Sequence, residues 1–268
     1  AVLNVKAHMR IRTILLQGSS VKSLTFLGDM FDGVQCPCIL LQLVATGKPL
    51  STVGMRIEDR TRTFIIAMER TVVPENFSFR MTDEEYRVLE KIKNSIPVCY
   101  LADHADFALG IVTGNNKKFL SAEKTEHSEM VLKGTDICKY HINPAKQYLP
   151  FEPEQFQQVA PLEIYRAPEK LLYRFISNQL VVAYDDRQML SLNSCNIVIP
   201  KIEGMQIKYI LAILNSSVSQ FVYQKEFHSI KVLRAHMGHI PIPRVGKAIQ
   251  NEIIAMTEPD RKSTRLNS

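Results

Sequence analysis

The first part of the chain changes from a helical to a strand-like arrangement of apolar positions. Residues 5–17 carry apolar side chains among basic ones at the spacing of an amphipathic helix, and residues 23–31 alternate as a short strand does. Residues 37–45 (PCILLQLVA) form a continuous apolar run, which is typical of a strand buried on both faces of an α/β sheet. With weaker strand patterns at 52–57 and 62–68, the first 80 residues are predicted to form the far edge of a doubly wound sheet.

Residues 81–95 (MTDEEYRVLEKIKNS) show the strongest local signal for a helix. Thr82 is followed three residues later by Glu85, which makes a capping box at the start of the helix. One apolar face then repeats with the helical period, and Pro97 lies beyond the end. We interpret residues 81–105, this helix and its linker, as the boundary between two domains. The alternative is a helix internal to one domain.

From Ala108 onward, short apolar runs alternate with turns. The strand-like runs are 108–113, 129–142, 162–166, 170–176, 180–184 and 195–200. A hairpin-like turn is expected at Asp185-Asp186, and residues 207–224 repeat apolar positions as one long helix does. Prolines within residues 239–245 end the helical pattern. These alternations predict a second domain, of the α+β class, over residues 106–259.

The composition is that of a globular chain. Of its 268 residues 46% are hydrophobic, which is enough for one large domain or two smaller ones with their own cores. No apolar run is long enough to span a membrane, so a membrane is not expected as a partner. The five cysteines show no disulfide-like spacing, which favours the reducing environment of a cytoplasm.

The last residues of the chain, 260–268 (DRKSTRLNS), share no pattern with the rest. They match, codon by codon, the translation of a sequencing adapter, so we expect a non-native tail there and leave it out of the fold. This tail holds three basic residues and one acidic residue, and the formal net charge of +6 falls to +4 without it. The basic excess that is left is a weak sign of a polyanionic partner.

Candidate chemistry begins at a turn that carries two lysines, GIVTGNNKKFL at residues 110–120. The turn lacks the glycine-lysine-serine or -threonine ending of a phosphate-binding loop. The groups that it offers to the phosphates of a nucleic acid are those of Thr113, Gly114, Asn115, Asn116, Lys117 and Lys118. The alternative is a plain turn closed by glycine and asparagine, with solvated lysines.

Polar residues also occur within the strand-like runs that follow. Lys170 and Arg174 are four residues apart on one strand and share a face, which suits either a nucleic-acid groove or a solvated sheet face. In the stretch KGTDI, Lys133 and Asp136 form either part of a DNA-binding surface or an ion pair in which Asp136 caps a turn. Ser191, Asn193 and Ser194 are short polar residues that either hydrogen-bond a base or a phosphate or are ordinary loop residues, and Ser191 and Asn193 are the candidates for DNA contacts.

The histidines do not predict a metal site. His236 and His239 lie near His228, but no carboxylate or cysteine stands at a spacing that would complete a ligand set. The surrounding glycine and prolines also oppose a pair of ligands on one helix. No metal is therefore expected.

Several short elements follow one another in a fixed order between residues 106 and 245. They are GIVTGNN (110–116), KGTDI (133–137), EKLLYRFI (169–176), SLNSCNI (191–197), ILAILNS (210–216) and IPIP (240–243). In this order they resemble the specificity domain of TaqI-like adenine-specific DNA methyltransferases and of type IIG restriction-modification enzymes. Residues 1–80 then resemble the end of the catalytic domain that precedes it, at the edge of a Rossmann-like sheet.

The resemblance implies a bacterial or phage enzyme that methylates adenine in double-stranded DNA with S-adenosylmethionine as cofactor, with or without a fused nuclease. Such enzymes need a glycine-rich cofactor loop and an Asp/Asn-Pro-Pro-aromatic motif, and this sequence contains neither. The nearest string, Asn143-Pro144-Ala145, lacks the second proline and the aromatic residue. We therefore expect an inactive C-terminal fragment with no catalytic residue and no bound cofactor, whose partners are DNA and the missing N-terminal catalytic region.

A different class of protein is the alternative, namely a protein–protein interaction module that binds no nucleic acid. The positions of five cations separate the two hypotheses. A DNA reader should gather them on one concave face, whereas an interaction module should scatter them around an exposed apolar patch. These cations are Lys117, Lys118, Lys133, Lys170 and Arg174.

Overall fold

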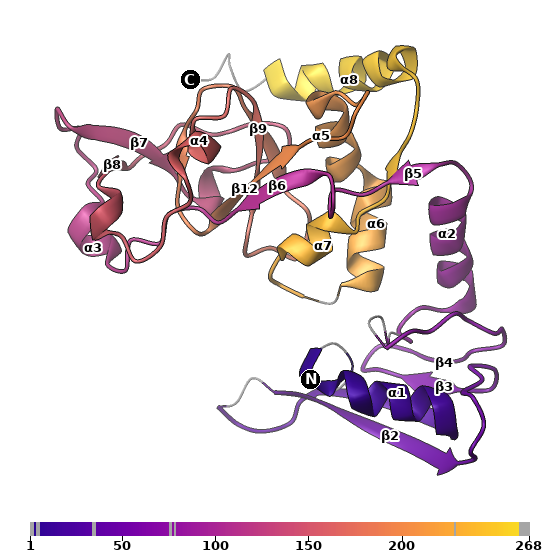
Figure 1. Cartoon of the computed structure of the whole chain (residues 1–268). Coiled ribbons are helices and arrows are strands. Elements are labelled where there is room, and N and C mark those ends of the chain that lie inside the picture. Colours follow the sequence, from indigo (N-terminus) through magenta and orange to yellow (C-terminus); the bar gives the residue numbers. More distant parts are fainter. Residues whose placement is uncertain are drawn as a thin grey trace. The chain divides into compact units, whose positions relative to one another are not determined.

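A computed structural model describes residues 3, 6–33, 36–74, 77, 79–227 and 229–262, of which Lys6 and 258–262 are described by their backbone alone (Figure 1). The chain divides into two compact units, residues 1–91 and 92–268. The division falls inside helix α2 (Asp83–Asn94), near the end of the helix that the sequence predicts at 81–95. Within these described ranges, no helix is long and apolar enough to cross a membrane.

The first unit is built on a mixed four-stranded sheet with the order β2-β1-β3-β4. Its elements are η1 (Lys6–His8), α1 (Met9–Gly18), β1 (Ser19–Asp29), β2 (Pro37–Ala45), β3 (Arg56–Glu58) and β4 (Thr63–Ile65). Strand β1 pairs antiparallel with β2 and parallel with β3, and β3 pairs antiparallel with β4. Helix α1 packs on the sheet through Leu15, in a core that includes the fully buried Leu24, Ile57 and Phe79.

The burial predicted for residues 37–45 is wrong. Strand β2 has the predicted bounds, but it is paired with β1 alone and lies at the edge of the sheet. The side chains of Leu40 and Val44 are 60% and 51% exposed, because they point away from the face on which the core lies and no second layer covers them in the described residues. Since the sheet has a single parallel pair, the edge of a Rossmann-like sheet is not confirmed.

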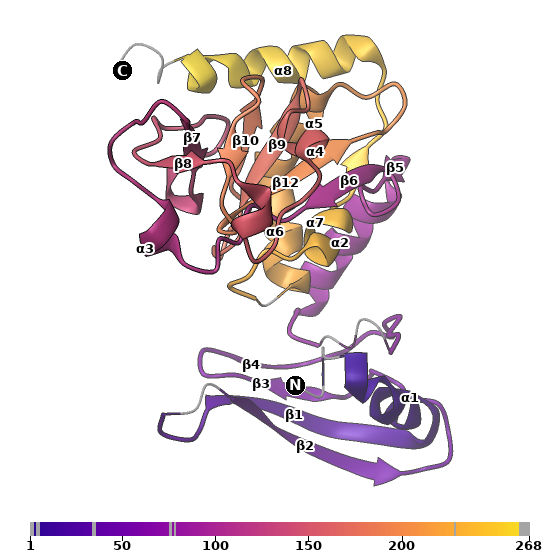
Figure 2. The ribbon, with the colours of Figure 1, turned by 60° about the vertical axis from the view of Figure 1, so that its left-hand side comes forward.

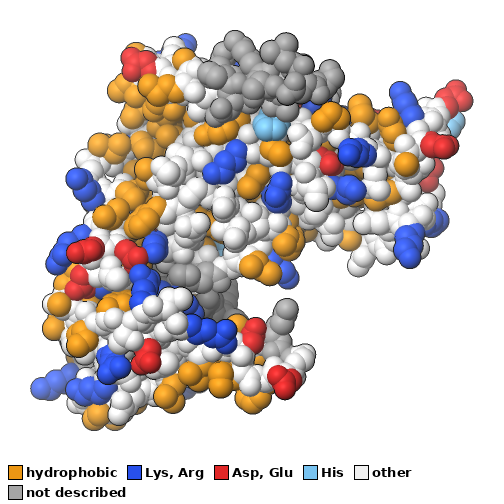
Figure 3. Space-filling model, turned by 180° about the vertical axis from the view of Figure 1, so that it is seen from behind, with side chains coloured by type: hydrophobic (Ala, Val, Ile, Leu, Met, Phe, Trp, Pro, Cys, Tyr) orange, Lys and Arg blue, Asp and Glu red, His pale blue; other side chains and the backbone are white. Residues whose placement is uncertain are grey.

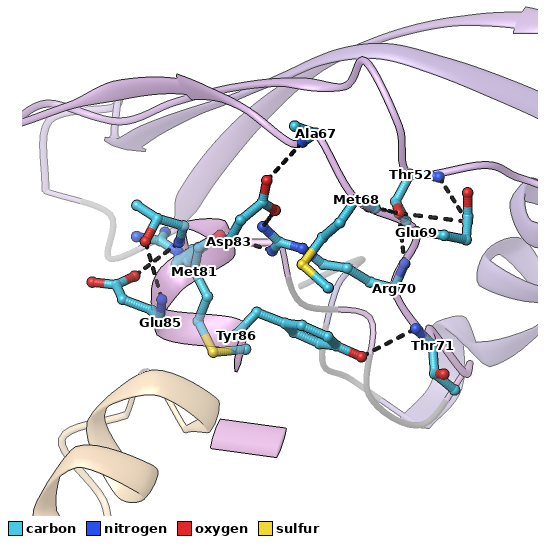
Figure 4. A network of polar contacts seen from close by, with 12 residues as sticks. Thr52, Ala67, Met68, Glu69, Arg70, Thr71, Met81, Asp83, Glu85 and Tyr86 are labelled. Carbon is cyan, nitrogen blue, oxygen red and sulfur yellow. Dashed lines mark hydrogen bonds and ion pairs between the residues drawn. The ribbon is translucent and has the colours of Figure 1, made fainter. Parts of the chain in front are cut away.

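The start of helix α2 is held by polar contacts within the first unit (Figure 4). The predicted capping box is confirmed, since Glu85 accepts a hydrogen bond from the Thr82 N–H at 2.9 Å and the Glu85 N–H donates to Thr82 Oγ1 at 3.3 Å. The buried guanidinium of Arg70 donates to the Met81 carbonyl at 2.7 Å and forms an ion pair with Asp83. Asp83 also accepts from the Ala67 N–H at 2.8 Å, so one carboxylate ties the helix to two points of the preceding loop.

The second unit is an α+β arrangement around an antiparallel four-stranded sheet with the order β10-β9-β12-β6. Its strands are β5 (Val98–Cys99), β6 (Ala105–Ala108), β7 (Ser128–Leu132), β8 (Tyr148–Pro150), β9 (Lys170–Arg174), β10 (Val182–Asp185), β11 (Leu190–Ser191), β12 (Cys195–Pro200) and β13 (Ile242–Pro243). A smaller sheet has the order β11-β7-β8, and β13 pairs with β5.

Short helices and longer C-terminal helices complete the second unit. They are α3 (Asn116–Phe119), η2 (Gly134–Asp136), η3 (Pro153–Gln155), α4 (Leu162–Tyr165), α5 (Ile207–Asn215), α6 (Ser217–Glu226), α7 (Arg234–Gly238) and α8 (Lys247–Lys262). Helix α5 packs on β9 and β10, while β7 and β8 lie on the opposite side of this unit (Figure 1). Figure 2 shows α8 running along the unit next to α5. The main core fills the space between the two sheets, for example with Val131, Leu172 and Ile197.

Three sequence predictions for the second unit are wrong in detail. Residues 162–165 form helix α4 instead of a strand, because Pro161 begins a turn that buries Tyr165. No hairpin joins β10 to β11, since β11 pairs with β7. The Asp185 carboxylate instead accepts hydrogen bonds from the N–H groups of Arg187 and Met189, which turns the chain away from β10. The long helix is interrupted at Ser216, whose hydroxyl caps α6.

Helix α8 was not predicted from the sequence. Its backbone continues through residues 260–262 of the expected tail, and residues 263–268 lie outside the described part of the chain. The signal that indicates this helix is the spacing of Ile249, Ile253 and Met256, which places three apolar side chains on one helical stripe.

Replacement of Asp83 by alanine should weaken the first unit by about 3 kcal/mol, because it leaves the Arg70 guanidinium buried without its charged partner. Burial raises the pKa of Asp83, but hydrogen bonds from Arg70 and the Ala67 N–H outweigh it and hold the pKa below its ordinary value. The stabilising effect is therefore present at neutral pH and is lost as the pH falls through the pKa of the folded state.

Hydrogen exchange of peptides from residues 52–89 measures this change without interference from the second unit. The matched control is Glu84→Ala, which removes an exposed carboxylate from the same helical turn. Equal protection in Asp83→Ala and the wild type at neutral pH would contradict the prediction.

Candidate nucleic-acid interface

Three of the stretches that the sequence singles out meet at the turn formed by residues 192–195. The Asn193 N–H donates to the Ile111 carbonyl at 3.0 Å, which attaches the turn that carries Lys117 and Lys118. The Gly134 N–H donates to Ser194 Oγ at 3.0 Å, which attaches the KGTDI stretch. The turn at 192–195 therefore brings loops that are far apart in the sequence to one place.

Two glycines make this convergence possible. A Cβ atom at Gly110 would overlap the backbone carbonyl of Leu192, and a Cβ atom at Gly134 would overlap that of Ser194. Neither glycine has a positive φ, so space, and not backbone conformation, requires glycine at both positions. The opening glycine of GIVTGNN and the glycine of KGTDI thus serve the same purpose, a close approach to one turn.

The lysine-bearing turn is held by its own short polar residues. Thr113 is buried, and its hydroxyl donates to the side-chain oxygen of Asn116 at 2.6 Å. Gly114 has a φ of 78°, a conformation that favours glycine, and Asn115 caps helix α3. The side chains of Lys117 and Lys118 are exposed, with the Lys118 ammonium 4.6 Å from the centre of the Phe119 ring. Of this group, the two lysines are the side chains best placed to meet a phosphate.

The KGTDI stretch is fixed by its aspartate. Asp136 is buried, and its carboxylate accepts the Lys133 N–H at 2.8 Å, which closes the turn η2 as the structural interpretation predicts. The Lys133 ammonium makes no ion pair with Asp136 in the described part of the chain, and its side chain is half-buried. Thr135 at the apex of the turn is exposed, and no sequence pattern had singled it out.

The prediction that Lys170 contacts DNA is wrong. Lys170 is fully buried, and its ammonium donates to the Tyr165 carbonyl and to the Asp185 carboxylate, both at 2.6 Å. Burial lowers the pKa of Lys170, and the attraction of Asp185 opposes this shift without cancelling it. The missed signal is that Lys170 and Asp185 stand directly opposite each other at the ends of two adjacent strands.

The remaining candidates also separate into internal and accessible residues. Ser191 is fully buried in β11, so its predicted contact with DNA is wrong as well. Arg174 is half-buried, and its guanidinium donates to the carbonyls of Gly134 and Ile137. Asn193 is exposed at the tip of the central turn.

The five cations therefore do not form one basic groove, since Lys170 is internal and Arg174 is directed at backbone carbonyls. Over the face of the second unit seen in Figure 3, Lys and Arg side chains are dispersed among hydrophobic, uncharged and some acidic ones. What the structure provides is a set of exposed polar positions on loops that share one anchor. They are Gly114, Asn115, Asn116, Lys117, Lys118, Thr135 and Asn193, with Lys133 partly accessible.

The histidines do not form a metal site in the described part of the chain, where no group of three His, Cys, Asp or Glu side chains is placed to hold an ion. His236 stacks on Phe227 with ring centres 4.6 Å apart, and burial lowers the pKa of His236. His228 lies outside the described residues.

Residues 129–242, which contain the central turn, match the sequence profile of the TaqI-like C-terminal specificity domain. This part of the second unit is thus similar to a TaqI-like specificity domain. No curated protein matches the sequence of the chain.

The fold of this chain is similar to that of one solved restriction-modification enzyme. The type IIL enzyme MmeI, solved in complex with DNA, matches all of this chain with a TM-score of 0.58 and 10% identity. The type IIG endonuclease BpuSI matches with a TM-score of 0.42 and 10% identity, over 96% of this chain and 41% of that one. The HsdS subunit from Thermoanaerobacter tengcongensis matches with a TM-score of 0.41 and 13% identity, over 68% of this chain and 44% of that one. The chain spans 41% of the length of MmeI.

Gly134→Ala should destabilise the second unit by about 2 kcal/mol or more, because the added methyl group must displace the backbone carbonyl of Ser194. Urea unfolding of the purified chain measures the effect. Gly246→Ala is the matched control, since a Cβ atom there meets no atom and the backbone needs no positive φ. Equal stability of the two variants would show that the close approach does not constrain residue 134.

Lys170→Met should cost about 3 kcal/mol, because Asp185 is then left buried without its cation. The double variant Lys170→Met/Asp185→Asn should recover part of this loss, since it removes the unpaired buried charge and keeps one oxygen for the N–H group of Arg187 or of Met189, which bind different oxygens of Asp185. Lys117→Gln, at an exposed lysine, should be nearly neutral. The order of the urea midpoints checks the prediction, and a Lys170→Met midpoint equal to that of Lys117→Gln would refute it.

Proposed function

We propose that this chain provides DNA target recognition to a restriction-modification enzyme. The observation that carries the proposal is the match of residues 129–242 to a specificity domain. The fold that the chain shares with MmeI, an enzyme solved in complex with DNA, supports it. The alternative of an interaction module that binds no nucleic acid is not favoured by these similarities.

The accessible residues are of two kinds, which suit two kinds of contact with DNA. Contacts to phosphates position a protein on the duplex, and contacts to base edges specify the sequence. Lys117 and Lys118, at the end of the lysine-bearing turn, supply positive charge for phosphates. Thr135 and Asn193 are short, uncharged hydrogen-bonding side chains on loops with a common anchor, which suits contacts with base edges.

For the intact protein, we propose site-specific methylation of the adenine amino group with S-adenosylmethionine. The residues of this chain do not fit that cofactor or the adenine. The one string that approaches the adenine-binding motif contains Asn143, and its side-chain amide donates to Cys138 Sγ at 3.3 Å while its N–H donates to the Asp136 carbonyl at 2.8 Å. Asn143 is thus engaged inside the specificity domain. The methyl transfer is therefore assigned to a catalytic region outside these residues.

Binding of this chain to DNA should weaken steeply as salt rises, because phosphate contacts release counterions. The probe is a library of duplexes of random sequence, and fluorescence anisotropy at several salt concentrations gives the slope of log Kd against log salt. Lys117→Gln/Lys118→Gln should reduce the magnitude of the slope by about two, one for each lysine that no longer neutralises a phosphate. Lys247→Gln, which removes an exposed lysine outside the matched specificity domain, is the control and should leave the slope unchanged.

Two results would count against the proposal. Binding that does not depend on salt would remove the role of phosphates and favour the interaction module. A slope that changes equally in the double variant and in Lys247→Gln would show that the lysine-bearing turn has no special part in binding.

A further inference from the structure

We propose that Arg174 is a positioning residue, which fixes the turn at residues 133–137 for reading of DNA bases without touching the DNA itself. The inference rests on the proposed function, since it concerns how that surface is built. It reverses the role that the sequence suggests for an arginine on a strand face next to a nucleic-acid site.

The guanidinium of Arg174 is directed at both ends of one turn. Its Nε donates to the Gly134 carbonyl at 2.9 Å, and its Nη2 donates to the Ile137 carbonyl at 2.6 Å. These two carbonyls bracket the turn η2, with Thr135 exposed between them. A planar guanidinium holds two acceptors at a fixed separation, so the distance between the ends of the turn is set by one rigid group.

Arg174 is itself held firmly. It is the last residue of β9, which lies inside the four-stranded sheet between β10 and β12. The Arg174 N–H donates to the Val181 carbonyl, and Cys195 is its register partner on β12. The next residue, Phe175, donates its N–H to the Ser194 carbonyl at 3.0 Å. The turn at 133–137 is thereby connected through the Arg174 side chain to the central sheet of the unit.

Ser194 provides a second, uncharged attachment of the same turn. Its hydroxyl accepts the Gly134 N–H at 3.0 Å, so the peptide groups of Gly134 are held by Ser194 on one side and by Arg174 on the other. The exposed Asn193 precedes Ser194, and the exposed Thr135 follows Gly134. The two side chains proposed to read bases are therefore adjacent to these two attachments.

The charge of Arg174 is met inside the protein by backbone carbonyls. No carboxylate lies within ion-pair distance of Arg174 in the residues that the structure describes. Its cationic donors meet the carbonyl oxygens of a short helical turn, and such oxygens carry partial negative charge. The competing interpretation is that its half-buried guanidinium also reaches a phosphate, and this makes a different prediction for salt dependence.

The experiment uses the whole chain and a duplex that the wild type selects from a random-sequence library. Arg174→Gln removes the positive charge and the paired hydrogen bonds to the carbonyls of Gly134 and Ile137. Ser194→Ala removes the hydrogen bond to the Gly134 N–H without any change of charge. Both should bind the selected duplex about tenfold more weakly while the slope of log Kd against log salt stays that of the wild type. Binding to random duplexes should change by less than about twofold, because phosphate contacts are intact. Lys117→Gln is the control that should reduce the slope by about one.

The outcomes distinguish a failure of the role proposed for Arg174 from a failure of the proposed function in DNA recognition. A slope reduced by about one in Arg174→Gln would mean that Arg174 contacts a phosphate, and the positioning role would be wrong while DNA recognition stands. If Arg174→Gln does not fold, Ser194→Ala decides, since unchanged affinity for the selected duplex in that variant overturns the positioning role. A wild-type chain that selects no duplex and binds DNA without salt dependence would overturn the proposed function and this inference with it.

Discussion

The second unit depends on the close approach of two loops to the turn at residues 192–195. Backbone carbonyls of that turn occupy the space that side chains at Gly110 and Gly134 would need. Because a carbonyl inside a hydrogen-bonded turn cannot move independently, the constraint acts on all three segments at once. Cys195 is both the last residue of the turn and the first of β12, so the loops take their positions from the central sheet.

Two basic residues near the interface are directed into the protein. Lys170 pairs with Asp185 in the core, and Arg174 binds two carbonyls of an adjacent loop. A buried pair of charges is costly to desolvate and seldom adds much net stability, but it allows one arrangement of the strands and penalises others. In this domain these two internal cations define geometry, and the positive charge that we propose for contacts with DNA is that of the exposed Lys117 and Lys118.

Much of the architecture can be predicted from local patterns, where the residues involved are close in sequence. Helix α2 follows from Thr82 and Glu85, which cap it as a local motif requires. The break of the long helix at Ser216 is harder to predict, because it depends on Asn215, whose amide bonds to Val182 in a strand distant in sequence. Strand β2 has the predicted bounds and the wrong burial for the same reason, since burial depends on which segments cover a strand.

The candidate site shows the same limit more sharply. A period of two along β9 correctly places Lys170 and Arg174 on one face, but it does not tell whether that face meets water, a partner or a second layer of the same domain. The order of short motifs is more informative, because each motif contains the glycine or the polar residue that joins it to the others, as Gly134 and Ser194 show. The resemblance to the family thus rests on residues that join the loops to one another, such as Gly134 and Ser194. The residues proposed to read a DNA sequence, Thr135 and Asn193, are their neighbours in the chain.

This separation has a consequence for how such a domain changes its target. The frame residues Gly110, Gly134 and Arg174 are constrained by backbone atoms at a close distance, so substitutions there disturb several loops together. Thr135 and Asn193 project from the frame into solvent, where most side chains can be accommodated at little cost in stability. If these two positions read bases, as proposed, a new DNA sequence can be recognised through substitutions that leave the fold intact. On that proposal, a rigid frame with exchangeable exposed residues lets the recognised sequence change while the fold stays the same.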